Sequence, residues 1–84
     1  MDAAFLVEQY LPCVEPSRLG ELVRRLEAHA PAVSLLGVAG LPEDETLLAL
    51  VAARDPDSVA RALTGAGVTP DRIVPALWLP GQRG

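Results

Sequence analysis

The stretch that decides the fold is Leu47-Leu48-Ala49-Leu50-Val51-Ala52-Ala53, which contains no polar residue. Successive side chains of a β-strand point to opposite faces of its sheet, so a strand with one face in water alternates apolar and polar residues. This run has no such alternation. We therefore expect a strand at 46–53 whose two faces are both covered.

Upstream of this run, the sequence predicts a strand, a helix and a second strand. Residues 3–11 have the apolar and aromatic content of a strand, and Pro12 ends it. Residues 17–30 predict an amphipathic helix, because apolar side chains recur there at helical spacing: Leu19, Leu22, Val23, Leu26 and Ala30. Residues 32–41 predict a second strand, which an acidic turn at 42–45 joins to the central run.

Downstream of the run, the start of a second helix is marked clearly. Asp55 is a suitable N-cap, and Pro56 fits the first helical position, where no amide donor is needed. Gly65 and Gly67 indicate the end of this helix. Residues 72–79 predict the last strand, and 80–84 are expected to form a flexible tail.

The predicted order is βαββαβ, which is the ferredoxin-like α+β plan in a single domain at 1–79. Right-handed crossovers place the first and third strands at the centre of a four-stranded antiparallel sheet. The fourth strand then lies at an edge, which agrees with Pro75, because proline is tolerated at sheet edges.

The two predicted helices are enough to cover one face of such a sheet. About eight apolar side chains would remain on the other face, and soluble monomers rarely expose an apolar patch of that size. Pairing with the same face of a second copy would cover it. We therefore expect a homodimer of the dimeric α+β barrel type.

Composition limits the classes of partner. The net charge of the 84 residues is -4, whereas nucleic-acid binding relies on clustered cations. No apolar run approaches membrane-spanning length, and the start of the chain does not look like a secretory leader. Cys13 is the single cysteine, so no disulfide forms within the chain. We expect a cytoplasmic protein that binds neither nucleic acid nor membrane.

Three segments carry a resemblance to a known family: FLVEQYLP at 5–12, LPEDET at 41–46 and AGVTPDRI at 66–73. They resemble a family of small bacterial proteins of unknown function whose best-known member is described as a nickel-responsive, nickel-binding protein. The resemblance covers most of residues 4–76 and implies a ferredoxin-like dimeric α+β barrel.

The chain departs from this family where a metal would bind. Family members tend to carry a histidine in the second strand and a cysteine in the third, but here these stretches read SLLGV at 34–38 and LLAL at 47–50. Nickel prefers imidazole or thiolate ligands. His29 and Cys13 form no spaced ligand pair, so the residues predict no metal site and name no cofactor.

Glu8 and Tyr10 are the first candidates for a functional site. They lie two apart on the first strand and share a sheet face with Leu6. A carboxylate on a central strand is costly to bury unless it is paired, and burial can turn it into a base. The alternative is that Glu8 pairs with an arginine and that Tyr10 lies at the rim of the sheet.

His29 and Trp78 are the other candidates. His29 is the only imidazole, and it is either a base or a partly solvated residue near a helix C-terminus. Trp78 follows an edge strand and either closes a core or dimer contact or covers a ligand.

The leading hypothesis is a homodimer that binds a small hydrophobic ligand or a divalent metal, either between sheet and helices or at the dimer seam, through Glu8, Tyr10 and Trp78. One alternative is a cofactor-free cyclase, isomerase or monooxygenase-like enzyme. In that case Glu8 or His29 is the base and Tyr10 a proton donor. Another alternative is an interaction module without a pocket.

Overall fold

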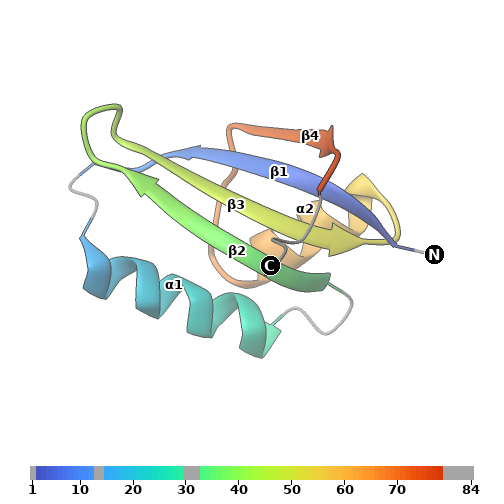
Figure 1. Cartoon of the computed structure of the whole chain (residues 1–84). Coiled ribbons are helices and arrows are strands. Elements are labelled where there is room, and N and C mark those ends of the chain that lie inside the picture. Colours follow the sequence, from blue (N-terminus) through green and yellow to red (C-terminus); the bar gives the residue numbers. More distant parts are fainter. Residues whose placement is uncertain (1, 13–14, 30–32, 79–84) are drawn as a thin grey trace, which may run out of the picture.

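The computed structural model describes residues 2–12, 15–29 and 33–78, apart from the side chain of His29. Four strands and two helices are found in this part of the chain, in the predicted order (Figure 1). They are β1 (Ala3–Tyr10), α1 (Pro16–His29), β2 (Val33–Leu41), β3 (Thr46–Ala53), α2 (Pro56–Gly65) and β4 (Arg72–Ala76). The fold is therefore ferredoxin-like α+β, as the sequence predicts.

The sheet is antiparallel with the strand order β2-β3-β1-β4, so β1 and β3 are central and β4 is an edge. Pro75 lies on this edge strand, as predicted. The expected last strand at 72–79 is too long, because the observed strand ends at Ala76. The pairing of β4 with β1 ends where Ala76 lies opposite Ala4. Residues 79–84, including the predicted tail, lie outside the described part.

Both helices lie on the same side of the sheet (Figure 1). Asp55 caps α2, because its carboxylate accepts hydrogen bonds from the backbone N–H and the hydroxyl of Ser58, both at 2.8 Å. These bonds hold the pKa of Asp55 below its ordinary value near 3.8, with Arg61 and Arg54 adding a smaller electrostatic effect. The predicted cap and the proline at the helix start are thus confirmed.

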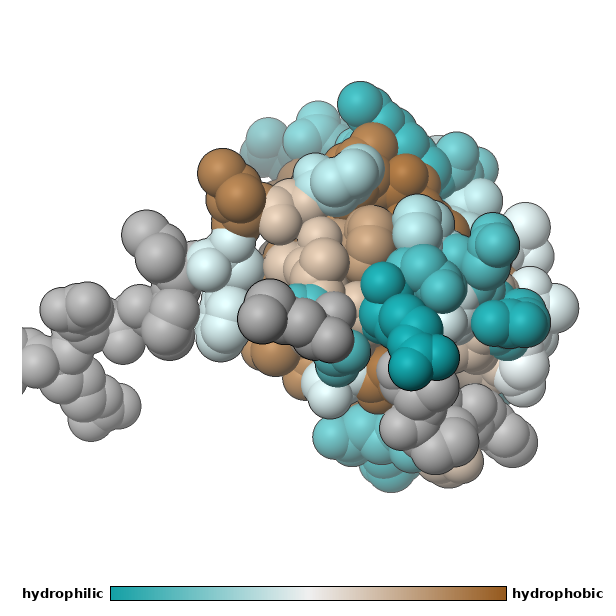
Figure 2. Space-filling model, turned by 90° about the vertical axis from the view of Figure 1, so that its right-hand side faces the viewer, coloured by the Kyte–Doolittle hydropathy of each residue, from teal (hydrophilic) through white to brown (hydrophobic). Residues whose placement is uncertain are grey.

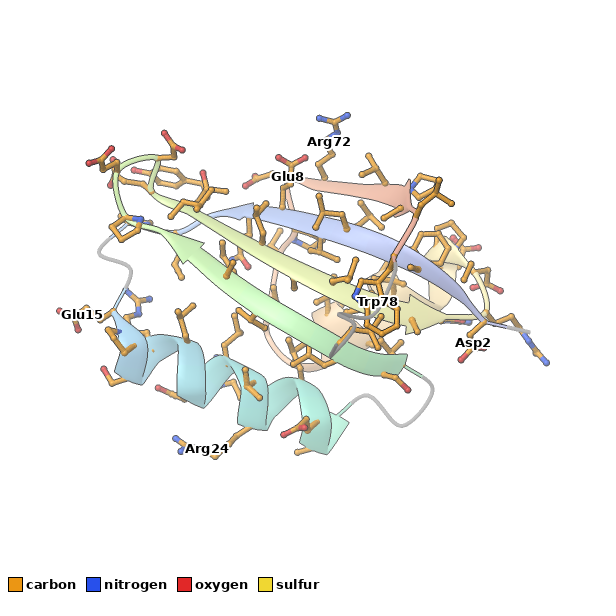
Figure 3. All side chains as sticks on the ribbon, viewed as in Figure 1. Asp2, Glu8, Glu15, Arg24, Arg72 and Trp78 are labelled. Carbon is orange, nitrogen blue, oxygen red and sulfur yellow. The ribbon has the colours of Figure 1, made fainter. Side chains whose placement is uncertain are left out.

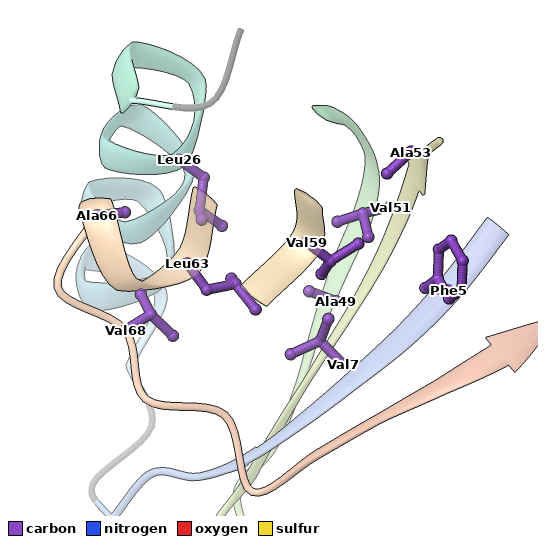
Figure 4. Close-up of a cluster of buried hydrophobic side chains, with 10 residues drawn as sticks. All are labelled: Phe5, Val7, Leu26, Ala49, Val51, Ala53, Val59, Leu63, Ala66 and Val68. Carbon is purple, nitrogen blue, oxygen red and sulfur yellow. The ribbon is translucent and has the colours of Figure 1, made fainter. Parts of the chain in front are cut away.

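The hydrophobic core lies between the helices and the sheet (Figure 4). The strands contribute the odd-numbered side chains of β1 and β3, and the helices contribute their apolar stripes. The buried residues of this cluster are Phe5, Val7, Leu26, Ala49, Val51, Ala53, Val59, Leu63, Ala66 and Val68. The side chains on one face of each central strand therefore form the core of a single chain.

The even-numbered side chains of β1 and β3 point away from the helices. We call this side of the sheet the open face. On β3, burial alternates strictly, with Leu47, Ala49, Val51 and Ala53 buried and the residues between them only half-buried. Figure 2 shows apolar surface, in tan and brown, gathered in the upper part of the molecule, next to hydrophilic surface. The single chain therefore covers one face of this strand and leaves the second apolar face in contact with water.

None of the helices in the described residues is long and apolar enough to cross a membrane.

Candidate functional site

The strand register arranges the open face in rows that run across the sheet. The first row is Ser34, Ala52, Ala4 and Ala76, one small residue from each strand. The second row contains larger apolar residues, Leu50, Leu6 and Val74. The third contains Ala39, Leu48, Glu8 and Arg72, and the fourth contains Leu41, Thr46 and Tyr10. The first two rows are therefore mainly apolar, and the charged pair of the face lies in the third row.

A hollow of about 400 Å³ lies over the row of small residues. Its floor includes Ala4, Ala52 and Ala76, whose short side chains make the surface lower than the neighbouring row of Leu50, Leu6 and Val74. Leu36, Leu77 and Trp78 line it as well. Leu36 has no partner in the register because β2 contains an irregularity between Leu35 and Gly37. The result is a mainly apolar depression at one end of the open face.

Trp78 lines this apolar hollow and is 45% exposed, so the indole is not part of the core. Leu77 beside it is fully exposed. Large apolar side chains with this much contact with water are typical of surfaces that bind a partner or a ligand. The position of Trp78 is consistent with both predicted roles, a dimer contact and the cover of a ligand.

Glu8 and Tyr10 lie at the other end of the open face, in a second hollow of about 310 Å³ that Thr46, Asp71 and Arg72 also line. Figure 3 shows Glu8 and Arg72 on the face away from the helices. Glu8 is four residues from Ala4 along β1, which corresponds to about 13 Å. The structure thus brings Glu8 and Tyr10 together and places Trp78 in the other hollow.

The contacts of Glu8 fit its predicted pairing with an arginine. Its Oε2 lies 3.3 Å from Nη1 of Arg72, which is opposite it on β4. Both side chains contact water, with 33% of Glu8 and 67% of Arg72 exposed. Such an exposed pair contributes little to stability.

Tyr10 is 59% exposed and lies at the rim, as its alternative role requires. Its hydroxyl is 3.4 Å from Oε2 of Glu45, in the turn between β2 and β3, which is a long hydrogen bond. The carboxylate of Asp71 accepts a hydrogen bond from the backbone N–H of Tyr10, and the N–H of Asp71 donates to the carbonyl of Glu8 at 2.8 Å. Asp71 therefore fixes the backbone at this end of β1.

The remaining candidates are not placed in either hollow. His29 is the last residue of α1, and its side chain lies outside the described part, as does Cys13. The acidic residues of the turn at 42–45 are exposed, with Glu45 at a positive φ of 49°. Within the described residues, no group of three histidine, cysteine, aspartate or glutamate side chains is arranged to hold a metal ion.

The centre of the space between sheet and helices is filled by side chains. A void of about 20 Å³ remains there, lined by core residues such as Leu26, Val51 and Val59. That is room for a single water molecule. Larger volumes lie on the open face and, on the helix side, beside the end of β1.

Sequence analysis missed the alanine floor, because which residues share a row depends on a register that no local pattern reveals. It also missed Gln9, although a signal existed. The side chain of Gln9 points to the same face of β1 as those of Phe5 and Val7, so it is a polar residue on the helix-facing side of the strand.

No known family model matches this chain, and a search of curated proteins finds no match. Among solved structures, it is similar to the crystal structure of SCO4226 from Streptomyces coelicolor A3(2), with a TM-score of 0.85. The alignment covers 93% of this chain and 100% of that chain at 17% sequence identity. At this identity the likeness establishes the fold, which a small bacterial protein shares over nearly the whole chain.

Proposed function

We propose that this chain is a homodimeric binding protein of the dimeric α+β barrel type, which holds a small hydrophobic ligand at the seam between two open faces. The observation that carries the proposal is the second apolar face of β3. Leu48, Leu50 and Ala52 alternate with buried core residues but are themselves only half-buried. A second copy that covers them would explain why this strand is apolar on both sides.

The size of the open face supports the pairing of two copies. Four strands about 4.8 Å apart and five to nine residues long, at about 3.3 Å per residue, give a face of roughly 500 Å² in projection. The accessible area is larger than the projection, so the face approaches the roughly 800 Å² that each partner of a standard interface buries. The small-residue row would leave a gap beside the apolar row of Leu50, Leu6 and Val74.

The apolar hollow over that row is the best-supported ligand position. Its volume of about 400 Å³ lies in the range of small-molecule sites, and its lining is mainly apolar. Pairing with a second copy would close the hollow toward water, and Trp78 would then lie against the ligand. The family resemblance supports the same dimeric architecture.

The experiment uses Trp78, the single tryptophan, as a reporter, with the dye 1-anilinonaphthalene-8-sulfonate as a hydrophobic probe. We expect the dye to bind with energy transfer from Trp78. Ala52→Leu, which fills the floor of the hollow, should remove that signal, whereas Ala28→Leu on the exposed side of α1 should not. Dye binding that is unchanged in Ala52→Leu would refute the ligand position.

Binding of a divalent metal, as described for the best-known member of the resembling family, is an alternative to a hydrophobic ligand. Its support is the resemblance alone, because the donor side chains of the described residues form no cluster. Titration calorimetry with nickel and zinc tests it directly, and the absence of heat at micromolar protein would remove it.

The enzyme alternative rests on the polar hollow, which places the carboxylate of Glu8 and the hydroxyl of Tyr10 beside one space of about 310 Å³. A base and a proton donor side by side are what enolate chemistry on a hydrophobic substrate requires. The binding proposal is preferred because it accounts for the apolar hollow and the open face together.

A further inference from the structure

The helix side of the molecule carries a third hollow, of about 320 Å³, between the end of β1, the first half of α1 and the segment that follows α2. Its lining combines polar groups with apolar ones. Because it lies on the opposite side of the sheet from the open face, pairing of two open faces would leave it accessible.

Gln9 of β1 is one of the residues that line this hollow. Its side-chain Oε1 is buried and, among the described residues, has no hydrogen-bond donor within reach. A buried carbonyl oxygen without a donor costs free energy, and native proteins leave few such atoms. An occupant of the hollow that donates a hydrogen bond would satisfy this atom.

Two arginines of α1 line the same hollow. Nη1 of Arg18 lies 3.3 Å from the carbonyl oxygen of Pro12, and Nη2 of Arg25 lies 3.5 Å from Oε1 of Glu21. A guanidinium carries five N–H donors, so these contacts use only a part of what each arginine offers.

Arg25 lies near Gly67, which has a positive φ of 78°. A Cβ atom on Gly67 would lie 3.9 Å from Nη1 of Arg25, so the guanidinium lies against this backbone turn. Two guanidiniums and the carboxylate of Glu21 leave a net charge of +1 at the hollow. One monoanion would neutralise this charge.

The apolar part of the lining is made by Leu11, Leu22 and Val68. At about 30 Å³ for each water molecule, the hollow has room for roughly ten non-hydrogen atoms. We propose that it binds a small 2-hydroxycarboxylate with an apolar body. The carboxylate accepts from the arginines, the hydroxyl donates to Oε1 of Gln9, and the body packs against the apolar side chains.

The test is a titration of the ¹⁵N-labelled protein, followed by NMR, with sodium mandelate and with sodium phenylacetate, which lacks the hydroxyl. We expect chemical-shift changes at the amides of Gln9, Gly67 and Val68. Mandelate should bind about tenfold more tightly than phenylacetate, which is the factor expected for one additional hydrogen bond. Gln9→Leu, which is similar in size, should abolish the difference between the two probes.

A matched pair of variants tests the charge. Arg25→Gln should weaken the binding of both probes about tenfold, because it removes a charge-assisted hydrogen bond. Arg24→Gln, next to it on α1 but outside the hollow, should leave both affinities unchanged.

Three results would overturn the proposal: shifts that are absent from the hollow, a preference for mandelate that survives Gln9→Leu, or equal effects of the two arginine variants. If Gln9→Leu does not fold, Gln9→Met gives the same comparison. None of these readouts depends on dimer formation or on the hollow beneath Trp78, so this proposal and the proposed function can fail separately.

Discussion

Replacing Leu50 by lysine should separate the two copies of the proposed dimer while leaving each chain folded. Leu50 lies at the middle of the open face, in the row with Leu6 and Val74, and its side chain is only half-buried in the single chain. The core positions on either side of it, Ala49 and Val51, point toward the helices and are not changed.

The magnitude follows from the area of the open face. Burying roughly 500 Å² on each copy, at about 25 cal/mol per Å², gives on the order of 25 kcal/mol of hydrophobic stabilisation. Association costs about 4–15 kcal/mol, so a dimer that forms at micromolar protein or below is expected. A buried leucine contributes about 1.5–3 kcal/mol, and a twofold dimer loses it twice.

Leu50→Lys should therefore raise the dissociation constant by about two to four powers of ten, before the cost of burying the two ammonium groups is added. The assay is sedimentation velocity over a range of protein concentrations. The wild-type chain should sediment with a mass of twice 8.8 kDa, and the variant with a mass of 8.8 kDa. The far-ultraviolet circular dichroism spectrum of the variant should be the same as that of the wild type.

Thr64→Lys is the matched control, because it makes the same change in charge on an exposed position of α2. It should dimerise like the wild type. The reasoning is refuted if the wild-type chain remains a monomer at high micromolar protein, or if Leu50→Lys and Thr64→Lys dimerise equally well.

Two further predictions concern charged groups. The pKa of Asp55 is lowered in the folded chain. Its cap therefore stabilises the fold at pH values above the ordinary pKa of about 3.8, and this stabilisation is lost as the pH falls through the lower pKa of the folded chain. Thermal unfolding should show that Asp55→Ala lowers the midpoint at pH 7 and that this difference shrinks in acid; an equal difference at both pH values would contradict the cap. Glu8→Gln should change the free energy of unfolding by less than about 1 kcal/mol, because the pair with Arg72 is exposed. A loss of several kcal/mol in urea unfolding would show that Glu8 has a larger structural role.

The elements of the fold could be predicted from the sequence because their signals are local. Asp55 and Pro56 begin α2, and the spacing of Val59 and Leu63 places its buried side against the sheet. Pro75 marks an edge strand. These patterns depend on backbone geometry within a few residues, so no partner segment is needed to interpret them.

The candidate site was predicted only in part. The face shared by Glu8 and Tyr10 follows from the two-residue period of a strand, and the structure places both in one hollow. The distance between this pair and Trp78 could not be predicted, because the last strand was expected to continue to residue 79 and instead ends at Ala76.

The sequence by itself determined the order of the elements and the second apolar face of β3, since each depends on the residue pattern along one segment. Only the tertiary structure decided which residues share a row. Ala4, Ala52 and Ala76 are far apart in the chain and form one floor only because β1 pairs with β3 and β4 in this register. The same holds for Gln9 and the arginines of α1, which line one hollow because the helix packs beside the end of β1. Register and packing arise from interactions between distant segments, and local sequence patterns carry little information about them.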